Sequence, residues 1–301
     1  MSGRPTAAIG IDVGGTKTAV AMVGTHDGQV LGVRQIDTVS RAGAAQLHDR
    51  LAPHLAELVA SVDVELVGVG VGVPELVNPD GLVVTEVVVP GLGGDLVEQW
   101  ADLGVTAVEA DVRAAAVAES RLGAGASRAS FVYVSVGTGI SHCLVVDGVP
   151  WAGANGAAIL LGSGVLADRA SLGGPIGTPA LEEYASGPGI VARYQELGGV
   201  ASSASEVVAR CALDDTAREV VSGAGRALGL GLAELVNLLD PHAVVVGGGL
   251  GSAPGLYWES AVAAARPAIW AEVARGVTVV QSAVGPLAGA IGAALISPVR
   301  T

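Results

Sequence analysis

The chain opens with short apolar runs separated by glycine turns. Residues 7–13 (AAIGIDV) and 18–23 (TAVAMV) are apolar runs on either side of a double-glycine turn, which predicts a β-hairpin and not the strand-helix-strand opening of a dinucleotide-binding fold. A third strand is expected over residues 29–34 after a second turn, followed by a helix near residues 43–62. The first part of the chain is therefore a three-strand meander followed by a helix.

The middle of the chain repeats this plan. Residues 131–136 and 141–146 are apolar runs that flank a second glycine turn, so two similar hairpins suggest duplicated halves. The other expected elements are strands over residues 66–73, 105–109, 243–246 and 277–281, and helices over residues 112–121, 182–197, 206–239 and 286–296.

Length and composition indicate a two-domain α/β protein. A chain of 301 residues exceeds the size at which one core usually keeps growing, so we expect domains over residues 1–111 and 112–301, with the last helix packed back on the first domain. Hydrophobic residues make up 50% of the chain but aromatic residues only 3%. The core must therefore consist of Val, Leu, Ile and Ala packed on glycine-rich backbone, which favours the α/β class.

Several classes of protein fit the sequence poorly. Every apolar run is interrupted before the roughly 18 to 20 residues that a membrane span requires, and we find no export signal. Cys143 and Cys211 are far apart and lack metal-ligand spacing, which is typical of a reducing compartment. A net charge of −13 argues against nucleic-acid binding. We expect a cytoplasmic protein.

The first glycine turn carries groups that suit a phosphate. Asp12 ends a strand, and Gly14, Gly15, Thr16 and Lys17 follow it, Lys17 being the single lysine of the chain. Successive backbone N–H groups in such a turn can bind phosphate oxygens, and the carboxylate can hold Mg²⁺ through water. The alternative is an ordinary tight hairpin with a solvent-facing acid.

Two further strands run into glycine-rich turns. These turns comprise Gly137, Thr138 and Gly139 in one case and Gly247, Gly248 and Gly249 in the other. The first of them adds a threonine hydroxyl and could complete a clamp for nucleotide phosphates. The second would permit close approach of a flat ligand such as adenine, although tight helix-strand packing explains it equally well.

Asp111 lies between an expected strand and an expected helix. In phosphoryl transfer a carboxylate there can accept the proton of the attacking hydroxyl. At a helix start it can also act as a purely structural cap, which is the better explanation from spacing alone.

Together the motifs resemble the ROK family (repressors, open reading frames and sugar kinases) from residue 9 to about residue 296. They occur in the order DVGGTK, GVGVP with NPDG, an acid ahead of RAAAVAE, VSVGTGI with VDG, LEEYASG and NLLDPHAVVVGGG. The resemblance implies a two-domain actin-like ATPase fold of the hexokinase/heat-shock-protein-70 superfamily, with its duplicated ribonuclease H-like motif. It also implies ATP and sugar in the cleft between the domains, and a homodimer.

The resemblance also implies roles for individual residues. Asp12 and residues 14–17 match the first phosphate loop, residues 137–139 the second, and residues 247–249 the nucleoside site. Asp111 matches the catalytic base. The expected substrate contacts are Glu75, Asn78, Asp111, Arg113, Gly156 and Glu182.

The chain departs from the family pattern where sugars are recognised. Ala110 and Arg113 replace two asparagines, and residues 159–163 (ILLGS) replace a Gly-Glu-x-Gly-His run. The positions that match the zinc ligands of many members hold Ser163, Gly173, Pro175 and Ala180, so we predict no zinc site. Each lost hydrogen bond costs roughly 1–3 kcal/mol of sugar binding. A deoxy or amino sugar or a cyclitol should therefore suit the pocket better than glucose.

Two functions remain open on this basis. One is an ATP-dependent kinase that phosphorylates a hydroxyl of a sugar or polyol, with Asp111 as general base and Mg²⁺ near Asp12. The other is a catalytically weak sensor or accessory protein that binds the same ligands. The retained Asp12, Lys17 and Asp111 favour the kinase.

Overall fold

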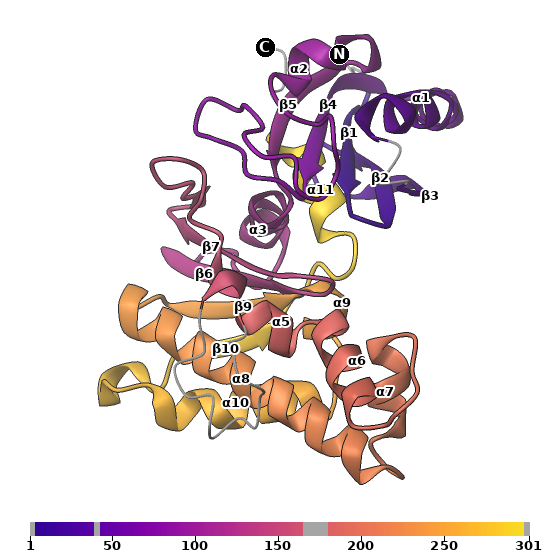
Figure 1. Ribbon diagram of the computed structural model, residues 1–301. Helices are drawn as coiled ribbons and strands as arrows, with labels where there is room; N and C mark the ends of the chain where they lie inside the picture. Colours follow the sequence, from indigo (N-terminus) through magenta and orange to yellow (C-terminus); the bar gives the residue numbers. More distant parts are fainter. Residues whose placement is uncertain (1–3, 39–42, 165–179, 298–301) are drawn as a thin grey trace. The chain divides into compact units, whose positions relative to one another are not determined.

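The computed structural model describes residues 4–38, 43–164 and 180–297. Its contacts divide the chain into two units, each built around one sheet (Figure 1). The first unit comprises Met1–Ser127, Gly148–Ala158 and Leu287–Thr301, and the second comprises Arg128–Asp147 and Ile159–Pro286.

The first unit contains a mixed five-stranded sheet in the order β3-β2-β1-β4-β5. The first three strands form the antiparallel meander expected from the sequence, and β4 and β5 extend it in parallel. The elements are β1 (Thr6–Val13), β2 (Lys17–Gly24), β3 (Val30–Asp37), α1 (Gly43–Ser61), β4 (Glu65–Val73), α2 (Leu96–Gln99), η2 (Ala101–Leu103), β5 (Val105–Ala110), α3 (Asp111–Leu122), β8 (Val149–Pro150) and α11 (Ala288–Ile296).

The second unit repeats part of this arrangement, with its strands in the order β10-β9-β6-β7. The hairpin of β6 and β7 is antiparallel, whereas β9 pairs in parallel with both β6 and β10. The elements are β6 (Ser130–Val136), β7 (Ile140–Val146), η3 (Leu161–Ser163), α5 (Leu181–Ala185), α6 (Gly187–Glu196), α7 (Ala204–Arg210), α8 (Asp215–Leu239), β9 (Ala243–Gly247), α9 (Gly248–Gly251), α10 (Leu256–Ala268), η4 (Glu272–Ala274) and β10 (Thr278–Gln281).

The last helix, α11, packs on β1, β4 and α3 of the first unit (Figure 1). Glycines make this packing possible, because a Cβ added at Gly10 or Gly70 would come within 1.8 Å of a backbone carbonyl of α11. Gly292 allows an equally close approach to the backbone of α3. Because α3 packs against α11, it belongs to the first unit. The first segment of this unit therefore ends at Ser127, whereas the sequence placed the domain boundary at Asp111.

Three helical segments differ from the sequence prediction. The helix expected over residues 182–197 is divided into α5 and α6 because Ser186 caps α6 by accepting a hydrogen bond from the Gly189 N–H. The helix expected over residues 206–239 is divided in the same way, at Asp214. Helix α10, which the sequence analysis did not assign, packs along α8. None of the helices in the described part of the chain is long and apolar enough to span a bilayer.

Candidate functional site

Two aspartates lie at the carboxyl edge of the first sheet. Asp12, near the end of β1, pairs with Gly72 of β4, and Asp111 begins α3 directly after β5. A Cβ added at Gly72 would lie 3.6 Å from the Asp111 Cα. The start of α3 therefore lies beside Gly72, at the register position of Asp12.

Burial changes the protonation of both carboxyl groups. Burial, together with a smaller effect of the charge of Asp111, raises the pKa of Asp12 to about 7. Burial, opposed by the Val112 N–H and the charge of Arg113 and assisted by Glu75, raises the pKa of Asp111 to about 6. A base whose pKa lies near the working pH is efficient, and two buried acids in one place suit a divalent cation.

The first glycine hairpin lies at the same edge of the sheet. Its turn closes when the Gly14 N–H donates to the Lys17 carbonyl, at 3.0 Å, so this N–H is already used. Thr16 and Lys17 are exposed at the tip. The start of α11 adjoins the site, because a Cβ at Gly289 would come within 2.2 Å of Asp12 Oδ2. The Gly14 N–H is therefore not available to a ligand, whereas Thr16 and Lys17 are exposed.

The second glycine hairpin opens into a cavity of about 800 Å³ within the second unit. Again the first glycine closes the turn, because the Gly137 N–H donates to the Gly139 carbonyl. The Gly137 carbonyl accepts from the Gly187 N–H. The predicted residues Gly137, Thr138 and Gly249 line the cavity together. The rest of the lining comes from α6, the segment before α7, α7 itself and α9, and comprises Gly187, Pro188, Val191, Ala192, Gln195, Ser202, Ser203, Ala204, Ser205, Val208, Ala209, Leu250 and Ala253.

These additional lining residues were not among the predicted site residues. One available signal was the run Ser186-Gly187-Pro188, which combines a helix cap with a glycine and a proline and so begins a new helix. The wall is predominantly apolar, with Gln195 and several serines as polar groups. A largely apolar cavity that ends at a glycine-threonine turn has the chemistry expected for a nucleoside with attached phosphates.

The three consecutive glycines after β9 have different surroundings. A Cβ at Gly247 would meet the Tyr133 hydroxyl at 2.2 Å, and one at Gly248, where φ is +79°, would meet the Val136 carbonyl at 2.5 Å. A Cβ at Gly249 would meet nothing within 4 Å. Tight packing on β6 thus explains Gly247 and Gly248, and only Gly249 lines the cavity.

The side chains of Glu75 and Asn78 accept hydrogen bonds from residues of the loop after β4. The Glu75 carboxylate is 4% exposed and accepts hydrogen bonds from Thr85, Val87, Val88 and Val89. Asn78 Oδ1 accepts from the backbone N–H groups of residues 80 and 82. Both side chains were expected to contact substrate, but these acceptor oxygens are used inside the protein.

Arg113 and Gly156 also have internal partners. The Arg113 guanidinium is completely buried and donates to Glu109 Oε1 and to the carbonyl oxygens of Val77 and Gly156. Gly156 has a φ of +75°, and a Cβ there would come within 2.0 Å of the Val77 carbonyl. Arg113 therefore joins three segments of the first unit, and its expected contact with a substrate stays a prediction.

Glu182 lies beside the second glycine hairpin. Its Oε2 accepts from the Ile140 N–H at 2.7 Å, and a Cβ at Gly139 would lie 2.7 Å from the same oxygen. The side chain is exposed, so the expected contact with a substrate hydroxyl stays a prediction.

The predicted absence of zinc also stays a prediction. Ser163 and Ala180 are described, but Gly173 and Pro175 lie outside the described residues. Within the described ranges no three His, Cys, Asp or Glu side chains are grouped as metal ligands.

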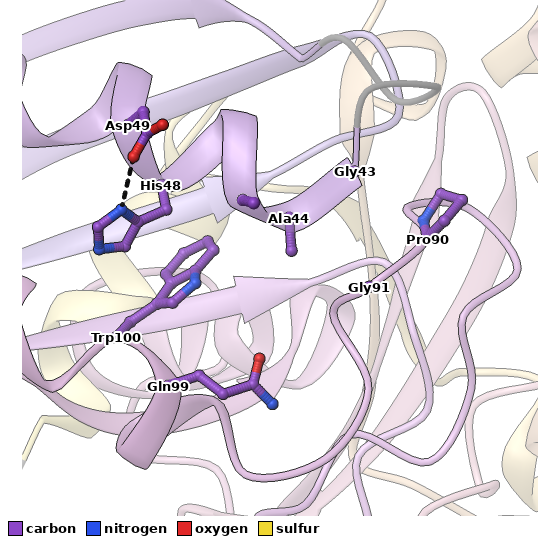
Figure 2. A pocket seen from close by; sticks show the side chains of 9 residues that line it. Gly43, Ala44, His48, Asp49, Pro90, Gly91, Gln99 and Trp100 are labelled. Carbon is purple, nitrogen blue, oxygen red and sulfur yellow. Dashed lines mark hydrogen bonds and ion pairs between the residues drawn. The ribbon is translucent and has the colours of Figure 1, made fainter.

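A second cavity, of about 670 Å³, lies in the first unit near the start of α1. Figure 2 shows His48, Trp100 and Gln99 around it. His48 Nε2 lies 3.0 Å from both carboxylate oxygens of Asp102, and this hydrogen bond raises the pKa of His48. Because Asp102 and Asp49 both neighbour the imidazole, the cavity has no uncompensated positive charge for an anion.

Comparison with known proteins places the chain in a family. The ROK family model matches residues 8–299. N-acetylmannosamine kinase of Escherichia fergusonii is 30% identical over 256 residues, which are 82% of this chain and 84% of that protein. A glucokinase of Halalkalibacterium halodurans is 28% identical over 268 residues, or 81% of each chain. The chain belongs to the ROK family.

Solved structures agree with the expected fold. The crystal structure of a ROK family glucokinase from Streptomyces griseus in complex with glucose and AMPPNP matches with a TM-score of 0.82 and 26% identity, over 97% of this chain and 99% of that chain. The ROK hexokinase from Thermus thermophilus matches with a TM-score of 0.78 and 28% identity, over 97% of each chain. The predicted α/β class and actin-like ATPase fold are confirmed.

Proposed function

We propose that the protein is an ATP-dependent kinase that phosphorylates a hydroxyl group of a sugar or a sugar-like polyol. The observation that carries this proposal is the pair of partly buried carboxyl groups, Asp12 and Asp111, at the edge of the sheet that bears the first glycine hairpin. The nucleotide-sized cavity at Gly137 and Thr138 supports the same function. The relatives, an N-acetylmannosamine kinase and two glucokinases, catalyse reactions of this kind.

In the proposed reaction the acceptor hydroxyl oxygen bonds to the γ-phosphorus of ATP as the bond to the bridging oxygen breaks and ADP leaves. Asp111 Oδ2 accepts the hydroxyl proton, while Oδ1 is held by the Val112 N–H at 2.6 Å. That hydrogen bond fixes the carboxylate in one orientation. The second unit would bind the nucleoside in its apolar cavity, and the exposed tip of the first hairpin would contribute donors to the phosphates.

Mg²⁺ fits the donor set at the first sheet. Asp12 would hold the ion through water, because Mg²⁺ keeps most of its hydration and takes one or two carboxylates. The ion supplies positive charge that neutralises the transferring phosphoryl group. The raised pKa of Asp12 without an ion is consistent with a site that a cation completes.

The acceptor is proposed to be a modified sugar, such as a deoxy or amino sugar, or a cyclitol. Arg113 is used internally, and Leu160, which replaces a family glutamate, is an apolar side chain that is 48% exposed. Neither residue offers the hydrogen bonds by which the family is expected to hold a hexose. The same losses favour the alternative of a weak sensor or accessory protein. We further propose a cytoplasmic homodimer.

The test is a coupled ADP-release assay with MgATP and a panel of hexoses, N-acetylated amino sugars, deoxy sugars and cyclitols. Asp111→Asn should lower kcat by about 100- to 10,000-fold, the usual contribution of a general base. The rise in melting temperature with MgADP should be retained, because the nucleotide cavity is intact. The matched control is Asp102→Asn, an acid-to-amide change at an exposed side chain of the same unit.

Two results would contradict the proposal. Undiminished turnover by Asp111→Asn would remove the base assignment. Nucleotide binding without phosphorylation of any acceptor would favour the sensor function.

A further inference from the structure

Glu75 is a buried carboxylate that carries an unusual number of hydrogen bonds for a loop. Oε1 accepts from the N–H groups of Val88 and Val89, at 2.6 and 3.0 Å, and Oε2 accepts from the Val87 N–H at 3.0 Å and the Thr85 hydroxyl at 2.7 Å. Burial by itself would raise the pKa of Glu75, but these four donors together lower it. The side chain is thus an ionised centre around which residues 85–89 fold.

Apolar burial contributes little to holding this loop. Val87 is 83% exposed and Val88 38% exposed, and only Val89 of the three valines is buried. The ends of the loop are tied by hydrogen bonds, since Thr85 Oγ1 accepts from the Leu76 N–H and the Pro90 carbonyl accepts from the Ala44 N–H. The conformation of the loop therefore depends chiefly on the Glu75 carboxylate.

The loop touches the first glycine hairpin. A Cβ added at Gly15 would lie 3.2 Å from Val88 Cγ1, so the valine side chain lies directly against the turn. The turn is closed by the hydrogen bond from the Gly14 N–H to the Lys17 carbonyl, and the Thr16 carbonyl accepts from the Thr38 N–H, just after β3, at 2.8 Å. Because one of these two bonds is made to a neighbouring segment, the exposed hairpin depends on its neighbours for a fixed conformation.

We propose that Glu75 is a positioning residue, which holds residues 85–89 so that Val88 supports the glycine hairpin in its phosphate-binding conformation. This inference rests on the proposed function, because it assigns the hairpin to the phosphates of ATP. Glu75 does not contact the phosphates. It acts through the loop, and the loop acts through the Val88 side chain.

The first measurement is hydrogen exchange of the substrate-free protein. In Glu75→Gln the amide nitrogen replaces one acceptor oxygen, so at least two of the four donors lose their partner. Backbone amides of residues 85–89 should exchange faster than in the wild type, and so should those of residues 14–17. The matched control is Glu86→Gln, an exposed acid of the same loop that accepts from the Gly91 N–H. It should leave the hairpin unchanged.

Val88→Ala separates the two steps of the coupling. It keeps the N–H that bonds to Glu75 but removes the side chain that touches Gly15. Exchange should rise in the hairpin but not in the loop. If the hairpin exchanges at its wild-type rate in both variants, Glu75 merely stabilises its own loop and the inference is wrong.

The second measurement is kcat/KM for MgATP, with glucose or N-acetylmannosamine as the acceptor probe. We expect a loss of about 10- to 100-fold in Glu75→Gln and a smaller loss in Val88→Ala, because small displacements of reacting groups have effects of this size. The melting temperature of Val88→Ala should stay near that of the wild type, so a fall in kcat/KM is not unfolding. If the wild type phosphorylates no acceptor, the proposed function fails, whereas the exchange experiment still decides the role of Glu75.

Discussion

The two glycine hairpins have the same plan but different surroundings. In each, an apolar strand ends in a turn whose first glycine, Gly14 or Gly137, donates its N–H within the turn. Around the first hairpin lie carboxyl groups, among them the partly buried Asp12 and the buried Glu75. The second opens into a mainly apolar cavity.

This difference indicates that two similar glycine turns are suited to different roles. A glycine turn supplies backbone donors wherever it occurs, and the neighbouring side chains decide what is done with a bound phosphate. Carboxylates suit the chemical step, and an apolar wall suits a nucleoside. Variants that alter charges near the first hairpin should therefore affect catalysis and pH dependence, and variants near the second should affect nucleotide binding.

The largest expected effect on stability comes from the buried charge at Arg113. Arg113→Met would leave the carbonyl oxygens of Val77 and Gly156 without this donor, and Glu109 Oε1 would lose the guanidinium but keep the Ala110 N–H. Removing one partner of a buried ion pair costs about 3–5 kcal/mol, and we expect about 3 kcal/mol because Glu109 is 25% exposed. Urea unfolding would measure this. Arg121→Met, on the exposed end of the same helix, is the control and should cost less than about 1 kcal/mol. Equal decreases in the free energy of unfolding of the two variants would show that the buried contacts of Arg113 contribute no more than an exposed arginine does.

The next effect separates packing from binding near the second hairpin. Gly248→Ala should destabilise the protein by about 2 kcal/mol or more, because φ is +79° and the new Cβ would collide with the Val136 backbone. Gly249→Ala should change the free energy of unfolding by no more than about 0.5 kcal/mol, because the new Cβ would meet no other atom within 4 Å. It should weaken MgADP binding, because Gly249 lines the cavity. Melting curves and calorimetric titration of the two variants would test this contrast. Wild-type nucleotide affinity in Gly249→Ala would contradict it.

The charges near the first hairpin predict a pH-dependent stability in metal-free buffer. Because the pKa of Asp12 is raised in the folded state to about 7, its protonated form contributes stability that is present below about pH 4 and lost as the pH rises through 7. Asp12→Asn does not titrate, so its stability relative to the wild type should grow from pH 5 to pH 8, to an order of 1–2 kcal/mol. Melting temperatures across this range would measure the difference. Asp102 does not contribute to this rise, because its hydrogen bond to His48 lowers its pKa and the stability it provides is lost only below about pH 4.

Much of the first unit could be predicted from the sequence, because its signals are local. Two apolar runs, the double glycine between them and the acid before the turn together define the hairpin of β1 and β2 and place Asp12 near the end of β1. Asp111 was also placed correctly at the start of a helix, although Ala110 is the capping position.

Features that depend on distant contacts could not be predicted in this way. Arg113 and Glu75 looked like ligand-binding residues, but their partners lie in loops whose positions only the fold determines. The residues that line the cavity could not be predicted either, because α6 and α7 are brought to the glycine turns by tertiary packing and not by their spacing in the sequence. Helix α10 was missed because the turn that begins it, at Gly255, has no side-chain cap.

The smallest effect tests where Glu182 acts. Its Oε2 fixes the Ile140 N–H next to the second hairpin, and Glu182→Gln keeps an acceptor oxygen there, so stability should fall by only about 1 kcal/mol. If Glu182 also binds an acceptor hydroxyl, KM for the acceptor should rise while the affinity for MgADP is unchanged. If it only supports the hairpin, MgADP binding should weaken and the acceptor KM should not change. Glu183→Gln, whose carboxylate accepts from the Ala180 N–H, is the neighbouring control for both measurements.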